Sequence, residues 1–323
     1  MPVFALLTAF ALTVGATALY LPLARRRRWV DAPNERSAHR EQTPNSGGLA
    51  IAASLAVSFV VFGPLLSGSI LVPVPILIAW SFFVIIGAID DRLSLPIVFR
   101  LCCYLGLAIP AASSFFPFEE YGVVSALAAL GLTWLVNLFN FMDGIDGIAA
   151  LQCFLTSSML SLLLYASGSP RELLVFSTIV AGAYGGFLLF NWPQAKLFMG
   201  DAGSLPGGLL LGVQALALAS SESRLGLAWF LLMSPFLLDT SFTLACRALQ
   251  GKRITQAHKE HVYQRLFRSF GALAVDRGLL ILHVLWLAPL ASLSALTSAP
   301  VWTLLTACLF PQLLLIAWAL SLK

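Results

Sequence analysis

The stretch NLFNFMDGIDGIAA, residues 137–150, places two carboxylates between two long apolar runs. The run YGVVSALAALGLTWLV ends immediately before it, and another apolar run follows. Asp143 and Asp146 are each followed by a glycine, which lets the backbone approach a ligand closely. A carboxylate near mid-bilayer costs about 2.5–3.5 kcal/mol, so this stretch is expected where membrane segments end.

The composition is that of a chain that crosses a membrane many times. Of 323 residues, 59% are hydrophobic and 11% are charged, against about 25% charged in soluble domains. The mean hydropathy is +0.88. Apolar segments of about 20 residues recur throughout, so we predict one all-α integral membrane domain over residues 1–323, a helix bundle. The expected spans are about 2–24, 47–66, 70–89, 97–117, 121–142, 147–168, 172–190, 204–220, 226–246, 278–297 and 300–320.

The distribution of lysine and arginine predicts the orientation, because cytoplasmic loops carry these residues in excess. With eleven spans and an external N-terminus, only Arg171 and Arg224 of the nineteen basic residues lie outside. The C-terminus is then cytoplasmic. The five cysteines all fall in apolar segments and are expected to be buried thiols. The chemistry of this protein is therefore expected in a cleft on the cytoplasmic face.

Five aspartates are expected at that face, at one depth and from three different loops. Asp90 and Asp91 follow the third span, Asp143 and Asp146 follow the fifth, and Asp201 lies between the seventh and eighth. Each alone could be a solvated loop residue. Together they favour a shared polar site, because hard cations such as Mg²⁺ take oxygen ligands from carboxylates and phosphates.

Glycine and basic residues near these aspartates favour phosphate chemistry. The sequences GGLA, DGIDG and MGDAGS, the last containing Gly200, allow backbone N–H groups to approach phosphate oxygens. Lys196 and the basic loop 247–277, which includes Arg265, offer positive charge for phosphoryl transfer. An ordinary positive-inside loop would account for that basic run equally well.

The histidines give several hypotheses. His258 and His261 lie three residues apart in the loop 247–277, and they either bind phosphate or sugar or are solvated. His39 is left open between function and loop structure. His283, inside an apolar segment, is expected to make a buried hydrogen bond. For Asp239, within the ninth span, a structural partner in the bundle is favoured over catalysis.

Taken together, these motifs resemble the polyprenyl-phosphate N-acetylhexosamine-1-phosphate transferases, relatives of the phospho-MurNAc-pentapeptide transferases. The matching stretches are DAPNERSAH, TPNSGG, GAIDDR, NLFNFMDGIDG and AKLFMGDAGS, followed by a histidine-bearing loop. They occur in this order over nearly the whole chain. The family includes the enzymes that begin O-antigen, enterobacterial common antigen and teichoic acid synthesis.

The resemblance implies a reaction. A UDP-activated N-acetylhexosamine gives its sugar 1-phosphate to undecaprenyl phosphate, releasing UMP, with Mg²⁺ required and Mn²⁺ as an alternative. The implied partners are the polyprenyl lipid, the UDP-sugar and membrane lipid, with no nucleic acid. A homodimer is compatible with the sequence. The implied location is the bacterial inner membrane.

The resemblance also assigns residues to roles. Asp90 and Asp91 match the pair near the lipid phosphate, one of them the expected base. Asp143 and Asp146 match the pair near the nucleotide diphosphate, and Asp201 matches the Mg²⁺ ligand, which we expect Asp146 to assist. The other expected substrate-binding residues are Asn137, Asn140, Lys196, Phe198, Gly200, His258, His261 and Arg265.

One motif departs from the family pattern. The usual HxHH is here HVYQ, with Tyr263 and Gln264 where histidines are expected. This variant is most similar to the O-antigen branch, whose donors include UDP-GlcNAc and deoxy-amino sugars such as UDP-N-acetylfucosamine. Two alternatives remain: an intramembrane Mg²⁺-dependent prenyltransferase and a secondary transporter.

Overall fold

The computed structural model describes residues 1–31, 42–67, 71–221, 223–253 and 258–322, and within them the chain is a helical bundle. Ten helices of the described chain are long and apolar enough to cross a membrane, and the shorter apolar helix α4 corresponds to the remaining one of the eleven predicted spans. They are α1 (Pro2–Arg27), α2 (Gly48–Ser67), α3 (Val74–Leu93), α4 (Ile97–Ser113), α6 (Val123–Met142), α7 (Ile148–Ala166), α8 (Arg171–Asn191), α9 (Asp201–Ser221), α10 (Ser223–Leu249), α12 (Ala272–Leu282) continuing through a π-helical turn into α13 (Ala288–Leu296), and α14 (Val301–Ser321).

Several helix ends differ from the sequence prediction by up to six residues. Helix α3 continues to Leu93, so Asp90 and Asp91 lie in its last turn and not after it. Helix α9 already begins at Asp201, because its first N–H groups find a carboxylate partner outside the helix. Helix α12 begins at Ala272, after Gly271 with φ 79°.

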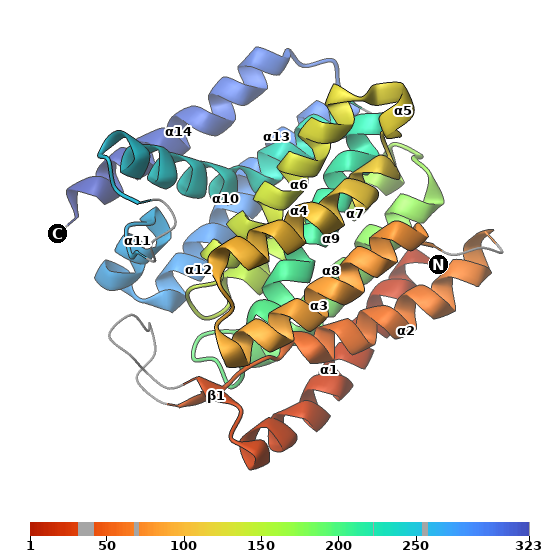
Figure 1. The fold of residues 1–323 in the computed structure, drawn as a ribbon. Helices are drawn as coiled ribbons and strands as arrows, with labels where there is room; N and C mark the ends of the chain where they lie inside the picture. The colour runs from red at the N-terminus through yellow and green to blue at the C-terminus, as the bar shows by residue number, and fades with distance from the viewer. Residues whose placement is uncertain (32–41, 68–70, 222, 254–257, 323) are drawn as a thin grey trace.

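Short elements gather at one end of the bundle. Strand β1 (Val30–Asp31) pairs antiparallel with β2 (Thr43–Pro44), and α11 (Val262–Phe270) lies in the loop before α12. Figure 1 shows β1 and α11 at one end, with α5 (Phe118–Tyr121) at the other. The two termini also lie at opposite ends of the bundle.

The buried centre consists of α7, α8 and α9, whereas α1 and α14 are mostly exposed along their apolar faces. Without a hydrophobic drive between helices in lipid, close packing relies on small residues. A Cβ on Gly182 of α8 would lie 2.4 Å from the carbonyl oxygen of Leu6, and one on Gly186 would lie 2.6 Å from that of Phe10. Helix α1 therefore lies directly on the backbone of α8.

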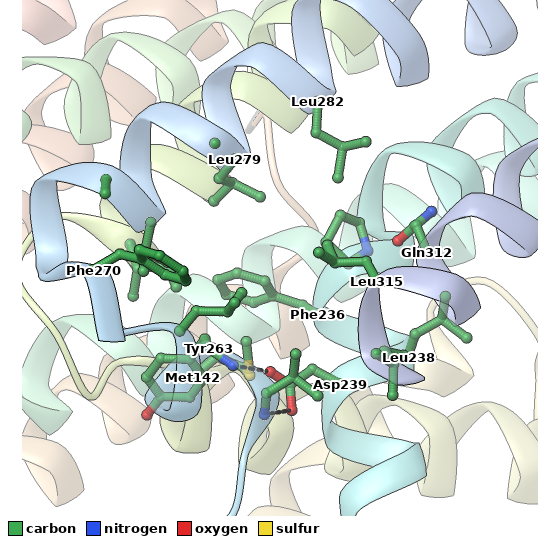
Figure 2. A pocket seen from close by; sticks show the side chains of 18 of the residues that line it. Met142, Phe236, Leu238, Asp239, Tyr263, Phe270, Leu279, Leu282, Gln312 and Leu315 are labelled. Atoms are coloured by element: carbon green, nitrogen blue, oxygen red, sulfur yellow. Dashed lines mark hydrogen bonds between the residues drawn. The ribbon is translucent and has the colours of Figure 1, made fainter. Parts of the chain in front are cut away.

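An apolar cavity of about 440 Å³ lies between α10, α11, α12 and α14 (Figure 2). Its walls include Phe236, Leu279 and Leu315, and Asp239 and Tyr263 lie together at one end of it. It is separate from the paired aspartates of α3, although Met142, just before Asp143, belongs to its lining.

The contact between α3 and the start of α9 yields a stability prediction. A Cβ on Gly87 would lie 2.2 Å from the carbonyl oxygen of Asp201, so Gly87→Ala must push the two helices apart. We expect it to destabilise the protein by about 1–3 kcal/mol, as overpacking does. The measurement is the thermal unfolding midpoint in detergent.

The matched control is Gly131→Ala, in the interior of α6, where a Cβ meets nothing within 4 Å. It should be neutral or stabilising by up to about 1 kcal/mol, because alanine favours helix over glycine. Equal midpoints for the two variants would contradict the close contact at Gly87.

Candidate active site

The N-terminus of α9 is held by a side chain from another helix. The Asp91 carboxylate in the last turn of α3 accepts hydrogen bonds from the backbone N–H of Asp201 at 2.7 Å and of Ala202 at 3.5 Å. Its Oδ2 also accepts the Ser46 hydroxyl at 2.7 Å. Helix N-termini leave N–H groups without intrahelical partners, and Asp91 satisfies two of these. Asp91 thereby brings α3, the turn before α2 and α9 to one point.

Asp90 faces a basic residue of the next helix. Arg100 of α4 contacts the Asp90 carboxylate at 2.5 Å and lies 3.7 Å from Asp201. The backbone N–H of Leu95 also donates to Asp90, at 2.6 Å. The side chain of Asp90 is only 4% exposed, so the guanidinium offsets a charge that water does not reach. Two of the predicted aspartates are thus joined through Arg100.

The C-terminal part of α6 places polar residues near Asp201. Asn140 donates from Nδ2 to Asp201 at 2.7 Å and to the Ser204 hydroxyl at 3.0 Å. Asn137 is half-buried one turn earlier, which places it on the same face of α6. Asp143 follows as the C-terminal cap residue of the helix. Residues from α3, α4 and α6 therefore converge on Asp201 at the start of α9.

Asp143 lies among like charges. Partial removal from water raises its pKa well above the ordinary value, and the charges of Asp201, Asp91 and Asp146 raise it further. Asp146 itself accepts the backbone N–H of Ala195 at 2.9 Å. It thereby ties the loop after α6 to the loop before α9, beside the exposed Lys196.

Backbone pairing holds the segment before Asp201. Phe198 exchanges main-chain hydrogen bonds with the TPNSGG stretch, donating to Pro44 at 2.8 Å and accepting from Gly47 at 2.9 Å. Gly200 has φ 68°, and a Cβ there would lie 2.5 Å from Asp91 Oδ2. The glycine is therefore required for the approach of α9 to Asp91, in addition to any role toward phosphate.

The histidine loop lies against the C-terminal end of α6. The rings of His258 and His261 stack with centroids 4.9 Å apart, and the Tyr263 hydroxyl donates to the Phe141 carbonyl at 3.0 Å. Burial lowers the pKa of His258 to about 4, with the charges of His261 and Arg247 contributing, so His258 is neutral at pH 7.

The remaining basic residue of the predicted set, Arg265, is half-buried one turn into α11. Its Nε donates to the Glu260 carbonyl at 3.4 Å. The structure therefore assigns Arg265 a contact within its own loop, and its role toward substrate stays a prediction.

The profile of the family described as Glycosyl transferase family 4 matches residues 73–219, which carry all five aspartates. The chain is also 30% identical over 303 residues to the decaprenyl-phosphate N-acetylglucosaminephosphotransferase of Mycolicibacterium smegmatis, covering 81% of this chain and 74% of that protein. This chain belongs to glycosyl transferase family 4.

Two further relatives of this family 4 transferase also carry the names of phospho-sugar transferases. It is 28% identical to the probable undecaprenyl-phosphate N-acetylglucosaminyl 1-phosphate transferase of Bacillus subtilis, over 92% of this chain and 86% of that one. It is 26% identical to the phospho-N-acetylmuramoyl-pentapeptide-transferase of Shouchella clausii, over 81% and 88%. The protein is therefore a multi-pass membrane enzyme that transfers phospho-sugars, which argues against the prenyltransferase and transporter alternatives.

The described residues contain no group of three or more histidine, cysteine, aspartate or glutamate side chains arranged around one metal position. Mg²⁺ is usually held by one or two carboxylates plus water and substrate phosphates, so its binding does not require such a group. The like-charge environment of Asp143, between Asp201 and Asp146, is the feature that a divalent cation would relieve. The residues present therefore fit such an ion.

Two functional candidates were not predicted from the sequence. Arg100 was counted only as an inner basic residue, although GAIDDR followed by an arginine in the next helix was visible. Asp276, at the start of α12, is fully buried against Gly147, and neither of its carboxylate oxygens has a hydrogen-bond partner within the described chain. The expected span 278–297 began two residues too late to include it. The stretch 32–41, with His39, lies outside the described residues.

The position of Arg100 makes a testable prediction. Arg100→Gln leaves Asp90 and Asp201 close together without a compensating charge. We expect turnover to fall at least tenfold and stability to drop by about 1.5–3 kcal/mol, the range for hydrogen bonds to charged groups. Initial rates and the thermal midpoint are the measurements. Arg171→Gln, at an exposed arginine starting α8, should leave both unchanged; equal losses in the two variants would contradict the role of Arg100.

The raised pKa of Asp143 predicts a pH-dependent stability difference. Between the ordinary pKa and the raised one, the folded protein binds a proton that the unfolded chain has lost, so its free energy of unfolding decreases as the pH rises. Asp143→Asn removes this pH-dependent loss of folding stability. The variant should therefore gain stability over the wild type on going from pH 5 to pH 8 in the absence of divalent cations.

Thermal unfolding in detergent measures this difference, and the exposed Glu119→Gln controls for the loss of a carboxylate in general. An Asp143→Asn advantage that grows on acidification would show that the carboxylate is stabilised in its charged form.

Proposed function

We propose that this enzyme transfers the sugar 1-phosphate of a UDP-N-acetylhexosamine to undecaprenyl phosphate, yielding the lipid-linked diphospho-sugar and UMP. The observation that carries the proposal is the convergence of Asp91, Asp143 and Asp201 from the ends of three separate helices, α3, α6 and α9, at one end of the bundle. The names of the relatives, which include transfer to decaprenyl and undecaprenyl phosphate, support this reaction class.

The residues divide into those that hold phosphates and those that hold the acids in place. Mg²⁺, or Mn²⁺, bound at Asp201 with help from Asp143 or Asp146, would neutralise phosphate charge. Asn140 orients the Asp201 carboxylate through its 2.7 Å hydrogen bond. Arg100, 3.7 Å from Asp201, supplies positive charge beside that carboxylate, and the exposed Lys196 of the loop before α9 offers a second positive charge. Phosphoryl transfer requires such charge more than covalent participation of the protein.

Deprotonation of the lipid phosphate needs little help from a catalytic base. A phosphate monoester has a second pKa of about 6, so most of it is already dianionic at pH 7. The base role proposed for Asp90 or Asp91 then concerns only the remaining fraction. Because both side chains already accept several hydrogen bonds, we infer that their larger contribution is to fix Arg100 and α9.

The proposal places this site at the cytoplasmic face of the bacterial inner membrane. The excess of basic residues in the predicted inner loops supports the orientation. A site at the level of the helix ends is accessible both to a lipid phosphate in the inner leaflet and to a nucleotide sugar from the cytosol. Only such a boundary position serves two substrates from different phases.

The sugar donor is proposed as UDP-GlcNAc or a deoxy-amino sugar such as UDP-N-acetylfucosamine. The HVYQ variant of the histidine loop supports the O-antigen branch of the family. Glu41 and Gln42 before Thr43, where the peptidoglycan enzymes carry lysine, argue against a MurNAc-pentapeptide donor.

An activity assay tests the proposal directly. Purified protein with undecaprenyl phosphate and Mg²⁺ should release UMP from one member of a panel of UDP-amino sugars, and EDTA should stop the release. Asp201→Asn should reduce the rate at least a hundredfold while the protein still inserts and purifies. Absence of UMP with every donor would reject the function, and a normal rate for Asp201→Asn would remove Asp201 from the phosphate site.

A further inference from the structure

A single buried carboxylate in α10 holds the start of the histidine loop. Asp239 is 5% exposed, and its oxygens accept the backbone N–H of Val262 at 2.9 Å and of Tyr263 at 2.8 Å (Figure 2). The hydroxyl of Thr243 lies 3.2 Å from the same carboxylate. Asp239 thus caps α11 from outside, as Asp91 caps α9.

The same carboxylate contacts the His261 ring, with Nδ1 3.1 Å from Oδ1. The His261 side chain also faces the backbone N–H of Gln264 in the capping box of α11. A carboxylate that already accepts two backbone N–H groups can only accept, so we assign the proton of the 3.1 Å contact to Nδ1. The other ring nitrogen, Nε2, is then the one available to a ligand. Stacking on His258 and the Phe141 ring at 6.3 Å fix the plane of the imidazole.

Helix α11 is also tied to the aspartate loop of the candidate site. The Tyr263 hydroxyl donates to the carbonyl of Phe141, two residues before Asp143. A Cβ on Gly144 would lie 2.0 Å from this hydroxyl, so the two loops are in direct contact. The Asp239 contacts therefore determine where His261 lies relative to Asp143.

We propose that Asp239 is a positioning residue for the transfer reaction: it fixes the Nδ1–H tautomer and the orientation of His261, so that the unprotonated Nε2 is presented as an acceptor to a hydroxyl or amide N–H group of the nucleotide sugar. The inference rests on the proposed function. Asp239 then has a positioning role in the reaction in addition to its structural role in the bundle. Carboxylate–histidine pairs that fix a ring in this way affect activity by 10–100-fold at metal sites when the carboxylate is changed.

The first test compares Asp239→Asn with Thr240→Val. Thr240 is the neighbouring residue, fully buried, and its hydroxyl has no hydrogen-bond partner within the described chain. We expect Asp239→Asn to lower kcat 10–100-fold with a change in KM for the UDP-sugar below threefold, and Thr240→Val to leave both unchanged. Loss of kcat in both variants in proportion to their thermal midpoints would overturn the proposal.

The second test asks whether Asp239 acts through His261. In a His261→Gln background, Asp239→Asn should have less than a twofold further effect on kcat, because the ring it positions is gone. A further tenfold loss would overturn the proposal.

A third measurement needs no turnover and separates this inference from the proposed function. Nitrogen-15 NMR of histidine-labelled protein, assigned with His261→Gln, should show the Nδ1–H tautomer of His261 in the wild type and a shift toward Nε2–H in Asp239→Asn. An Nε2–H ring in the wild type would overturn the proposal even if UMP is released. Failure of the UMP assay alone would reject the reaction and leave the tautomer result standing.

Discussion

The structure of the site depends on one interaction, the capping of α9 by Asp91. The first turn of a helix presents N–H groups without partners and the positive end of the helix dipole. Asp91 meets both needs from α3, with hydrogen bonds to the N–H groups of Asp201 and Ala202. The same dipole favours the carboxylate of Asp201 at the first position of α9. Two acidic side chains can therefore lie side by side at the end of membrane helices.

That polar contact is continued by backbone contacts along the helices. Gly87 of α3 and Gly48 of α2 both face the first turn of α9, where a Cβ would lie 2.2 Å from Asp201 O and 2.1 Å from Gly203 N. Helices in lipid gain little from burying apolar side chains against each other, so their association depends on van der Waals packing at close approach. The absence of side chains at these positions lets the Asp91 carboxylate reach the N-terminus of α9.

The sequence predicts much of this architecture, and the reasons are physical. Apolar segments of bilayer length identify the eleven helices, and basic residues favour one face, so the loops bearing Asp91, Asp143 and Asp201 were expected together. Which side chain meets which depends on helix ends and rotations that hydropathy does not encode. Asp91 as a cap, Arg100 as a bridge to Asp201, and the start of α9 at Asp201 itself were therefore not predicted.

The partner of Asp239 is a second side-chain pairing that the sequence does not predict. The sequence favours a structural partner in the bundle for Asp239, and Arg247 lies about two turns farther along the same helix. The structure instead pairs Arg247 with Glu260 at 3.0 Å and gives Asp239 to His261. Both contacts depend on the path by which the loop after α10 returns to that helix. The hydrophobic periodicity of the sequence does not predict this path. His283, by contrast, was correctly expected to be buried and hydrogen-bonded, since it contacts the Leu232 carbonyl at 3.0 Å.

The departure of the histidine loop from the family pattern has a structural explanation. Tyr263, where a histidine is expected, is 4% exposed and uses its hydroxyl to bind the Phe141 carbonyl. Burial raises its pKa, so the phenol remains protonated as a donor. Gln264 accepts the backbone N–H of His261 at 3.3 Å. Both replacements therefore anchor α11, which leaves the stacked pair of His258 and His261 as the part of this loop that we propose contacts the donor sugar.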